Sequence, residues 1–383
     1  MKAGWETKRL EGVASIEYGT RVVQKRDGGT RYPVYGGGGA TFSVDRTNRA
    51  DCFIVSRFGM SAECVRYVSG EFFLNDSGLT VSSRNSETLW QRFLDYQLLA
   101  KQPDIYTLGR GTAQKNLDVD AFRAMLINVP ASLDEQRRIV AVLDKAFANI
   151  ATATANAQKN LTNARATLKS CLGDMFAQRG SKWQRFELGS VCLRLHQGLN
   201  TAGEKIEFHA KGYPIIQTRN IENGKVNTTE KMKFVSSLDW EKYKEKYRPE
   251  IGDVFFTNIG TIGKTAVIET DIDYLIHWNI FKLRPDFNVV LPYYLKIYLD
   301  YLTESGHFSK IQTGGTVNFV TKKMISTSEI FVPPISEQRD VVVKAESLTN
   351  SIERLQLTYE QKLIALTELK QSLLQKAFAG ELT

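Results

Sequence analysis

Hydrophobic side chains recur at helical spacing over two long segments of the chain. In the first segment, apolar or small residues follow one another at a mean spacing of about 3.6 residues from Ile139 to Met175. In the second, the same spacing continues from Ile352 to Ala377. Each segment predicts one helix of about 45 residues, which at a rise of about 1.5 Å per residue would be roughly 65 to 70 Å long.

Both predicted helices carry recognisable start and stop signals. Ser132 and Glu135 form a capping box, in which the serine hydroxyl and the glutamate side chain satisfy backbone N–H groups of the first turn. Prolines at positions 333 and 334 precede the second helix, and Gly180 and Gly380 fit the two helix ends. Both helices are therefore bounded by sequence signals as well as by their periodicity.

An apolar stripe of this length has to be buried against a partner, and the two helices are natural partners for each other. The middle of the first is rich in alanine and that of the second in leucine, and small side chains pack closely against large ones. A chain that leaves along one helix, passes through a globular region and returns along the other predicts an antiparallel coiled coil. The alternative is two separate linker helices, each packed on its own domain.

The chain repeats itself between its two halves. The matches follow one another in the same order in both halves, which indicates a duplication. Their displacement drifts through the globular regions and is constant over the helical ones, so insertions fell in the former and the helices kept their length. The matches include Trp5 with Trp183 (178 positions), Gly111-Thr112-Ala113-Gln114 with Gly315-Thr316-Val317-Asn318 (204), Glu135-Gln136-Arg137 with Glu337-Gln338-Arg339 (202), and Phe176 with Phe378 (202).

Apolar runs alternate with helical patches in the two regions outside the long helices. Residues 52–55 and 253–256 are typical of strands, whereas residues 89–100 and 293–303 are typical of helices. The expected fold class is mixed α/β, with two similar α/β domains separated by two long antiparallel coiled-coil helices and related by a pseudo-two-fold internal repeat. The expected boundaries are 1–130 and 181–332 for the domains, and 131–180 and 333–383 for the helical spacers.

Charge and cysteine usage narrow the functional class. The chain has a net charge of +8 and a pI near 9.1, and each predicted domain carries +3, from 17 basic against 14 acidic residues and from 20 against 17. This balance suits an anionic partner. Four cysteines without CxxC spacing and four scattered histidines argue against structural zinc. The absence of a long apolar stretch predicts a cytoplasmic protein with no membrane segment.

Three segments resemble the spacer regions of Type I restriction-modification specificity subunits. They are residues 129–140, with Val-Pro followed by Leu-Asp-Glu-Gln-Arg-Arg-Ile-Val, residues 332–339, with Val-Pro-Pro-Ile-Ser-Glu-Gln-Arg, and the C-terminal residues 369–382. The first repeat departs from the second near its end, where residues 173–175 read Gly-Asp-Met and residues 375–377 read Gln-Lys-Ala.

The resemblance implies two target-recognition domains that each read one half of a bipartite, asymmetric site in double-stranded DNA. It implies spacer helices that set the distance between the half-sites and dock two modification (methyltransferase) subunits, with a restriction subunit completing the assembly. The chain itself would be non-catalytic and hold no cofactor, since S-adenosylmethionine is expected on the methyltransferase subunits. The spacer and docking candidates are Glu135, Gln136, Arg137, Phe176, Glu337, Gln338, Arg339 and Phe378.

A DNA reader needs cations for the phosphates and amide, hydroxyl or guanidinium groups for the base edges. Loops punctuated by glycine carry such groups at matching places in both halves, and the match pairs Arg57 with Asn258 and Asn75 with Trp278. Glycine turns that satisfy their own backbone groups are the alternative. The candidates are Arg57, Asn75, Arg110, Thr112, Gln114, Lys115 and Asn116 in the first domain, and Gln217, Arg219, Asn220, Asn258, Thr313, Thr316 and Asn318 in the second.

Two other functional classes remain open from sequence. A DNA-acting enzyme is disfavoured because no amino-methyltransferase motif of the Asn-Pro-Pro-Tyr type occurs, the nearest being Val-Pro-Pro-Ile at 332–335. The four glycines at 36–39 are not followed by the Gly-Lys-Ser/Thr of a phosphate loop, which argues against a nucleotide site. A protein-binding scaffold, with a coiled coil joining two ligand domains, is the other alternative.

Overall fold

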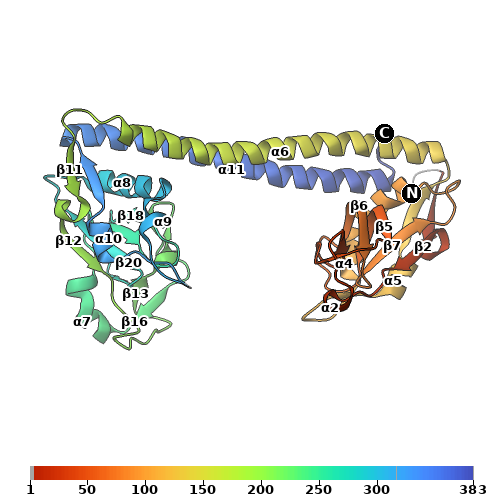
Figure 1. The fold of residues 1–383 in the computed structure, drawn as a ribbon, viewed down its shortest axis with the longest axis horizontal. Coiled ribbons are helices and arrows are strands. Elements are labelled where there is room, and N and C mark those ends of the chain that lie inside the picture. Colours follow the sequence, from red (N-terminus) through yellow and green to blue (C-terminus); the bar gives the residue numbers. More distant parts are fainter. Residues whose placement is uncertain (1–3, 316, 383) are drawn as a thin grey trace. The chain divides into compact units, whose positions relative to one another are not determined.

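The computed structural model describes residues 4–315 and 317–382 (Figure 1). It divides into two compact units, of which unit 1 comprises Met1–Lys159 and Glu360–Thr383 and unit 2 comprises Asn160–Tyr359. Each unit therefore joins one α/β domain to the beginning of one long helix and the end of the other.

The two long helices are α6 (Leu133–Ala177) and α11 (Ile335–Ala379), each of 45 residues. At the start of α6, the Ser132 hydroxyl accepts the N–H of Glu135 at 3.5 Å, which is the serine half of the predicted capping box. Gly380 directly follows α11 with a φ of 79°, a conformation that favours glycine at a helix end. The predicted helix lengths are confirmed.

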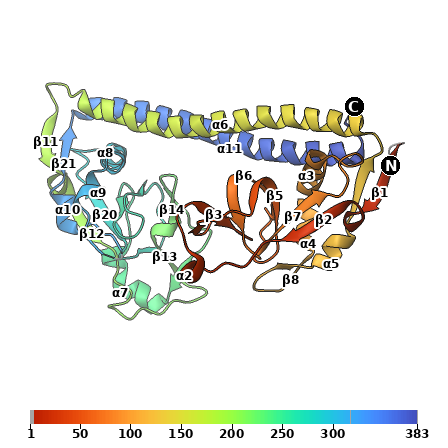
Figure 2. The same cartoon turned by 45° about the vertical axis from the view of Figure 1, so that its right-hand side comes forward.

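In each unit the two helices run in opposite directions against each other (Figures 1 and 2). In unit 1, Arg138 near the start of α6 donates to the carbonyl of Leu382 at 2.8 Å. In unit 2, the Asn160 amide donates to the Tyr359 hydroxyl at 3.0 Å, and Leu161 and Ala164 are buried along α6. The expected antiparallel pairing is confirmed, and the helices also pack on the domains.

The unit 1 domain is built on one six-stranded sheet in the order β2-β7-β5-β6-β3-β4, in which only β3 and β6 are parallel. A separate ribbon of β1 and β10 leads into α6. The elements are β1 (Trp5–Arg9), α1 (Leu10–Val13), β2 (Ala14–Tyr18), α2 (Gln24–Asp27), β3 (Tyr32–Tyr35), β4 (Ser43–Val44), β5 (Arg49–Ser56), β6 (Val65–Leu74), β7 (Gly78–Ser83), α3 (Gln91–Ala100), α4 (Gln102–Thr107), β8 (Gly109–Arg110), β9 (Asn116–Leu117), α5 (Val119–Ala124) and β10 (Leu126–Pro130).

Unit 2 repeats this order with the strand equivalent to β6 divided in two, giving sheets β12-β20-β17-β18 and β16-β13-β19. A ribbon of β11 and β21 leads into α11. The elements are β11 (Gln184–Glu187), η1 (Leu188–Val191), β12 (Cys192–Gln197), β13 (Tyr213–Ile216), η2 (Thr218–Asn220), β14 (Ile221–Glu222), β15 (Lys225–Val226), β16 (Lys233–Val235), α7 (Ser237–Tyr247), β17 (Val254–Thr257), β18 (Thr265–Val267), β19 (Leu275–Ile276), β20 (Ile280–Pro285), α8 (Pro292–Glu304), α9 (His307–Ile311), α10 (Lys322–Ser326) and β21 (Glu329–Val332). The expected mixed α/β fold class is confirmed.

Each domain core is completed by the far end of a long helix. In unit 1, Phe93 of α3 lies between Trp5 and Phe378 of α11, with ring centroids 6.3 and 5.2 Å away. The last turns of α11 therefore belong to the core of the first domain.

Unit 2 has the equivalent aromatic cluster. Tyr294 of α8 packs against Trp183 and against Phe176 of α6, with ring centroids 6.3 and 6.0 Å away. The last turns of α6 complete the second core as those of α11 complete the first, in agreement with the duplication.

Removal of the Phe378 ring should destabilise unit 1 strongly. The ring is 6 % exposed, so Phe378→Ala leaves a cavity in the core and should lower the free energy of unfolding by about 3–5 kcal/mol. Urea titration followed by hydrogen exchange of unit 1 peptides measures the loss. Leu369→Ala on the same helix, at a side chain 47 % exposed, is the control and should cost less than about 1 kcal/mol. Equal losses in the two variants would contradict this packing role.

Asp95 on α3 should make unit 1 less stable as the pH rises. Burial raises the pKa of its carboxyl to about 6, although Gln91 donates a hydrogen bond to it at 2.7 Å. The folded state therefore favours the protonated acid. Its contribution to the free energy of unfolding is fully present below the unfolded pKa near 4 and is lost as the pH rises through about 6.

The variant Asp95→Asn removes this dependence while keeping an acceptor for Gln91. It should raise the free energy of unfolding relative to the wild type by about 1–3 kcal/mol at pH 7.5, and by much less at pH 4.5. Denaturant titrations at the two pH values measure the difference. Asp120→Asn, at a carboxylate 94 % exposed, is the control. A gain for Asp95→Asn that is the same at both pH values would refute the assignment.

Candidate nucleic-acid interface

Five segments of unit 1 meet at one end of its six-stranded sheet. Arg57, which follows β5, lies among them: its N–H donates to the carbonyl of Ser77 and its own carbonyl accepts the N–H of Leu117, both at 2.8 Å. The Asn75 N–H donates to the carbonyl of Tyr35 at 2.8 Å, which joins the β6–β7 turn to the end of β3. We call this surface the unit 1 corner. It comprises residues 18–22, 35–38, 56–59, 75–77 and 110–117.

Unit 2 repeats this pattern of backbone hydrogen bonds. The Asn258 N–H donates to the carbonyl of Asn279 (3.1 Å), and the Asn258 carbonyl accepts the N–H of Val320 (2.9 Å). The His277 N–H donates to the carbonyl of Ile216 at 2.9 Å. The equivalent surface, the unit 2 corner, comprises residues 197–201, 216–220, 257–260, 277–279, 313–315 and 317–320.

The repeated bonds establish which residues correspond. Arg57 corresponds to Asn258, as the sequence match indicates. In each unit the N–H of this residue bonds to the turn before β7 or β20, and its carbonyl bonds to the end of the glycine-rich loop. Asn75 corresponds to His277, so its sequence pairing with Trp278 is wrong by one residue. Insertions between the strands hide this register in the sequence.

The structure also aligns the two glycine-rich loops differently from the sequence match, by one residue. Gly111 and Gly314 have φ values of 111° and 128°, and at each a Cβ would collide with the carbonyl oxygen three residues ahead. These two glycines are therefore equivalent, and Gln114 corresponds to Val317 rather than to Asn318. The two loops share this glycine conformation and present different side chains.

The Arg57 guanidinium is held in place at the unit 1 corner. Its central carbon lies 4.8 Å from the centre of the Tyr18 ring and 4.4 Å from that of Phe58, and it donates to the carbonyl of Asp76 at 3.3 Å. A half-buried guanidinium between two partly exposed rings loses little conformational freedom when it meets a phosphate or a guanine edge.

The 110–117 loop presents its polar groups to solvent. Arg110 is exposed and forms an ion pair with Asp118, and the Lys115 ammonium lies 4.0 Å from the centre of the Tyr106 ring. The structure thus brings these candidates beside Arg57 on one surface. The other exposed polar side chains of the loop are Thr112, Gln114 and Asn116.

A hollow of about 290 Å³ lies in the unit 1 corner beside this loop. Its wall includes Phe58 and the amides of Asn75 and Gln114. Glycines 36 to 38 line it, and at Gly37 a Cβ would collide with the carbonyl oxygen of Phe58, so the close approach of these two backbones requires glycine. The Asn75 side-chain oxygen already accepts the N–H groups of residues 22 and 76 at 3.3 and 2.8 Å.

Two unit 2 candidates are buried and used locally, so the prediction that they contact DNA is corrected. Asn220, 2 % exposed, accepts the N–H of Gln217 at 3.0 Å and donates to the carbonyl of Glu230 at 3.2 Å. Asn258, 1 % exposed, donates to the carbonyl of Val320 at 3.5 Å. Short amide side chains often satisfy nearby backbone groups, which removes these two from any base edge.

The other unit 2 candidates lie at the surface of the corner. Arg219 is exposed on η2, and Gln217 before it is half-buried. Thr313 and Asn318 are exposed on a loop. The backbone of Thr313 pairs with that of Phe319 at the base of this loop through two N–H to carbonyl hydrogen bonds of 3.0 and 2.8 Å. Thr316 lies outside the described residues.

Sequence reasoning missed several members of the corners. Tyr18 and Phe58 are exposed aromatic side chains there, and lone aromatic residues at strand ends give no pattern that separates them from core residues. His277 faces Thr201, with 3.1 Å between its Nε2 and the hydroxyl, and burial lowers its pKa. A correct alignment of the two halves would have paired His277 with Asn75 and so made it a candidate.

Four of the spacer candidates are buried inside their own units. Gln136 and Gln338 are fully buried, and Phe176 and Phe378 are 1 and 6 % exposed. These side chains hold domains and helices together within the chain. Of the remaining candidates, Arg137 and Arg339 are exposed, whereas Glu135 pairs with Arg138 at 2.7 Å and Glu337 accepts a hydrogen bond from Trp183 at 3.2 Å.

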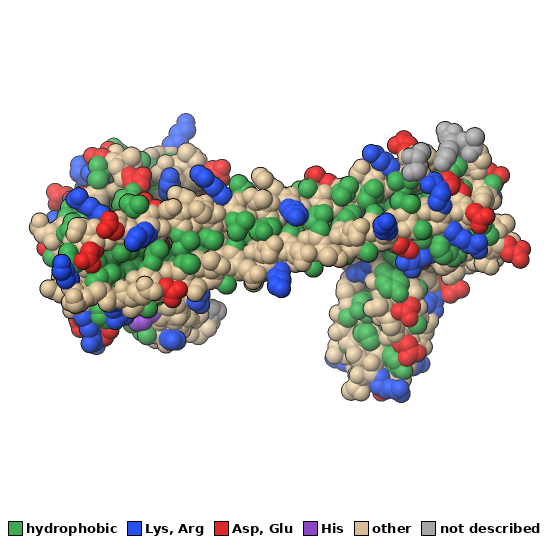
Figure 3. Space-filling view, turned by 90° about the horizontal axis from the view of Figure 1, so that it is seen from above, with side chains coloured by type: hydrophobic (Ala, Val, Ile, Leu, Met, Phe, Trp, Pro, Cys, Tyr) green, Lys and Arg blue, Asp and Glu red, His purple; other side chains and the backbone are tan. Residues whose placement is uncertain are grey.

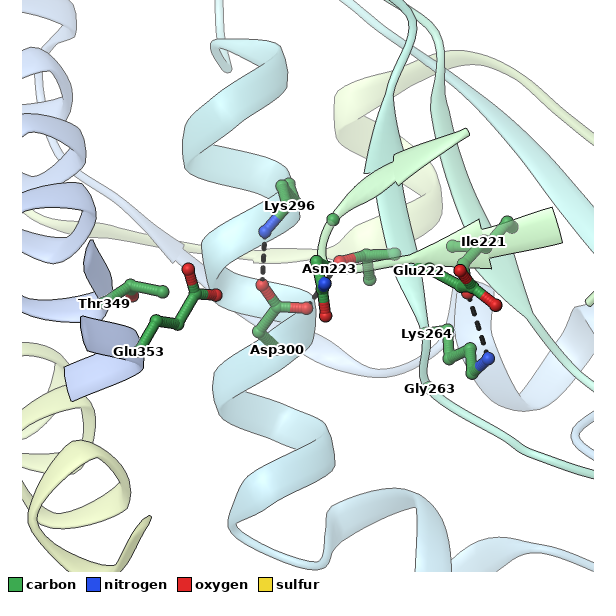
Figure 4. A pocket seen from close by; sticks show the side chains of 11 residues that line it. Ile221, Glu222, Asn223, Gly263, Lys264, Lys296, Asp300, Thr349 and Glu353 are labelled. Atoms are coloured by element: carbon green, nitrogen blue, oxygen red, sulfur yellow. Dashed lines mark hydrogen bonds and ion pairs between the residues drawn. The ribbon is translucent and has the colours of Figure 1, made fainter. Parts of the chain in front are cut away.

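A second hollow, of about 430 Å³, lies in unit 2 between α8, α11 and the turn after β14 (Figure 4). Lys296 pairs with Asp300 at 2.8 Å, and Lys264 donates to the carbonyl of Ile221 at 3.0 Å. Glu353 of α11 lines the opposite side. Its lysines are thus engaged within the domain, and no lining residue belongs to the unit 2 corner.

Over 4–315 and 317–382, no three or more His, Cys, Asp and Glu side chains are grouped so that they could hold a metal ion. Within the same residues, no helix is both long and apolar enough to cross a membrane.

The chain is similar in sequence to known specificity subunits. The chain is 26 % identical over 319 residues to the EcoBI specificity subunit of Escherichia coli, covering 81 % of this chain and 62 % of that one. It is 27 % identical over 201 residues to a putative specificity subunit, MjaX, of Methanocaldococcus jannaschii, covering 51 % and 45 %. The chain thus matches less than two thirds of the length of these relatives.

Solved structures share the fold. The HsdS subunit from Thermoanaerobacter tengcongensis superposes with a TM-score of 0.56 at 21 % identity, covering 100 % of this chain and 98 % of that one. A chain from a structural study of type I R-M system assembly superposes with a TM-score of 0.75 at 19 % identity, covering 100 % and 99 %.

A family model matches both halves of the chain. The model describes the Type I restriction modification DNA specificity domain, and the matched residues are 2–163 and 180–365. Each match spans one α/β domain together with most of the long helix that follows it. This protein therefore belongs to the Type I restriction modification DNA specificity domain family and carries two copies of the domain.

Proposed function

We propose that this chain is the DNA-recognition subunit of a Type I restriction-modification enzyme, in which each corner reads one half of a bipartite site. The observation that carries the proposal is the repeated corner: the same backbone hydrogen bonds present different side chains in the two units. A shared backbone would dock on DNA in the same way, whereas different side chains would select different bases. The two half-sites would then differ in sequence.

Each corner carries side chains suited to both roles, contact with phosphates and selection of bases. In unit 1, Arg57 and Lys115 supply cations, and the exposed amide of Gln114 has the two-sided hydrogen bonding that suits an adenine edge. In unit 2, Arg219 supplies a cation, and Asn318 an exposed amide. The net charge of +3 on each domain favours both halves of the DNA equally.

The long helices would set the distance between the half-sites and dock the methylating partners. Both are uninterrupted over 45 residues, so each is a stiff connection. Over α6 and α11, hydrophobic side chains lie between scattered lysines and arginines (Figure 3). Each unit contributes exposed apolar residues of this kind, which supports one methyltransferase subunit per unit. They are Val142, Ile364 and Leu369 in unit 1, and Val343, Leu355 and Leu357 in unit 2.

In this assembly the chain itself would be non-catalytic and act in the cytoplasm. S-adenosylmethionine would be bound by the two methyltransferase subunits, and a restriction subunit would join them. A chain that methylated or cut DNA alone would instead be an enzyme. A chain that formed a stable partner complex and protected no DNA sequence would be a scaffold.

Exchange of the first domain should change one half-site only. With residues 1–130 replaced by those of a relative, the complex with the methyltransferase subunits should keep the half-site read by unit 2 and acquire a new sequence for the other. Sequencing of methylated sites in a host carrying the hybrid measures both halves. A change in both half-sites would contradict the assignment of one reader to each unit.

Replacement of a single loop amide should relax one base position. Gln114→Ala removes an exposed side chain without disturbing the core, and discrimination at one position of the unit 1 half-site should fall by about 1–3 kcal/mol. Competition binding with a panel of single-base variants measures it on the complex with the methyltransferase subunits. Asn149→Ala, an exposed amide on α6, is the matched control and should leave every position unchanged. Unaltered discrimination in Gln114→Ala would exclude a base contact by this residue.

A further inference from the structure

A buried amide ties the start of α6 to the first domain at three points. The Gln136 side chain is fully buried, and its oxygen accepts the N–H of Trp90 at 2.8 Å. Its nitrogen donates to the carbonyls of Thr88 (2.9 Å) and Pro130 (3.1 Å). Because residues 88 and 90 directly precede α3 and residue 130 ends β10, this one side chain joins three segments of unit 1.

Gln338 makes the same three bonds in unit 2. Its oxygen accepts the N–H of Leu291 at 2.8 Å, and its nitrogen donates to the carbonyls of Val289 (2.8 Å) and Pro333 (2.9 Å). These positions precede α8 and follow β21, so they match those bonded by Gln136. The arrangement uses both amide hydrogens and the oxygen, a combination that a glutamate or an apolar side chain of similar size lacks.

Each domain is also attached to the helices by contacts between aromatic rings. In unit 1 this is the contact of Phe93 with Phe378, and in unit 2 that of Tyr294 with Phe176. Ring contacts resist separation but constrain orientation weakly, whereas buried hydrogen bonds are directional.

Polar side chains also join domain and helix, such as Arg92 with Asp144 in unit 1 (2.8 Å) and Trp183 with Glu337 in unit 2 (3.2 Å), but these groups are partly exposed and differ between the units. The glutamine bonds are fully buried and the same in both units, which makes them the contacts best suited to fix the angle at which a domain leaves its helices.

We propose that Gln136 and Gln338 are positioning residues, which hold each recognition domain at one angle on the helices and thereby fix the half-site spacing that the subunit accepts. This inference rests on the proposed function, since spacing has a meaning only for a bipartite site. Neither glutamine touches a corner, so their replacement should leave the bases that each corner reads unchanged.

The test compares spacing selectivity in glutamine variants and matched controls. Gln136→Met and Gln338→Met keep the length of the side chain and remove all three bonds. Arg137→Met and Arg339→Met change the next residue, which is exposed. Each full chain, in complex with the methyltransferase subunits, is titrated with DNA carrying the cognate half-sites at the natural spacing and at one base pair more or less.

The wild type and the arginine controls should prefer the natural spacing by about tenfold or more, and each glutamine variant by less than about threefold. Base preference within both half-sites should be retained, a separation that general destabilisation would not produce. A folded glutamine variant with wild-type spacing preference would overturn the inference. A wild-type complex that binds no bipartite DNA would instead overturn the proposed function.

A second measurement remains decisive if the methionine variants do not fold. Spin labels at the exposed positions of Lys145 on α6 and Arg46 in the first domain report the angle of that domain within unit 1 of the otherwise unaltered chain. A single narrow distance distribution in the DNA-free complex with the methyltransferase subunits is expected. A broad distribution, which narrows only when DNA is added, would show that the amide does not fix the angle and would overturn the inference.

Discussion

Each recognition domain depends on the burial of helix segments that are far apart in the sequence. The first domain needs Phe378, near the end of the chain, to complete its core, and the second needs Phe176. A helix that gained or lost residues would move its last aromatic ring away from the domain that it completes. This constraint explains why the displacement between the repeats is constant over the helical segments and varies elsewhere.

The features predicted correctly from the sequence are those fixed by long, regular patterns. The periodicity over α6 and α11 extends for many turns, and an apolar stripe of that length has few other structural explanations. Strand order in the domains depends on pairings between short, distant segments, which periodicity does not encode. The match of Gln114 to Asn318 failed for a related reason, because two consecutive glycines, Gly314 and Gly315, begin the second loop and the sequence does not show which of them corresponds to Gly111.

Local hydrogen bonding explains why individual site residues were harder to predict. Asn220 and Asn258 have the side chains expected of base-reading residues, but both are buried and satisfy backbone groups. The same amide chemistry suits a base edge and a turn, so only burial distinguishes the two. Gln136 shows the reverse case: it was selected as part of a repeated tripeptide, and its burial turns an expected docking residue into an internal connection.

A polar side chain at the domain–helix junction has a physical advantage over an apolar one. An apolar side chain of similar volume would also fill the space, but it would accept several orientations of the domain with similar energy. The amide leaves buried backbone groups unsatisfied in every orientation except one, which penalises the alternatives by about 1–3 kcal/mol for each lost partner. The corners can therefore vary their side chains while the junction, with the same three bonds in both units, keeps the orientation of each domain on its helices.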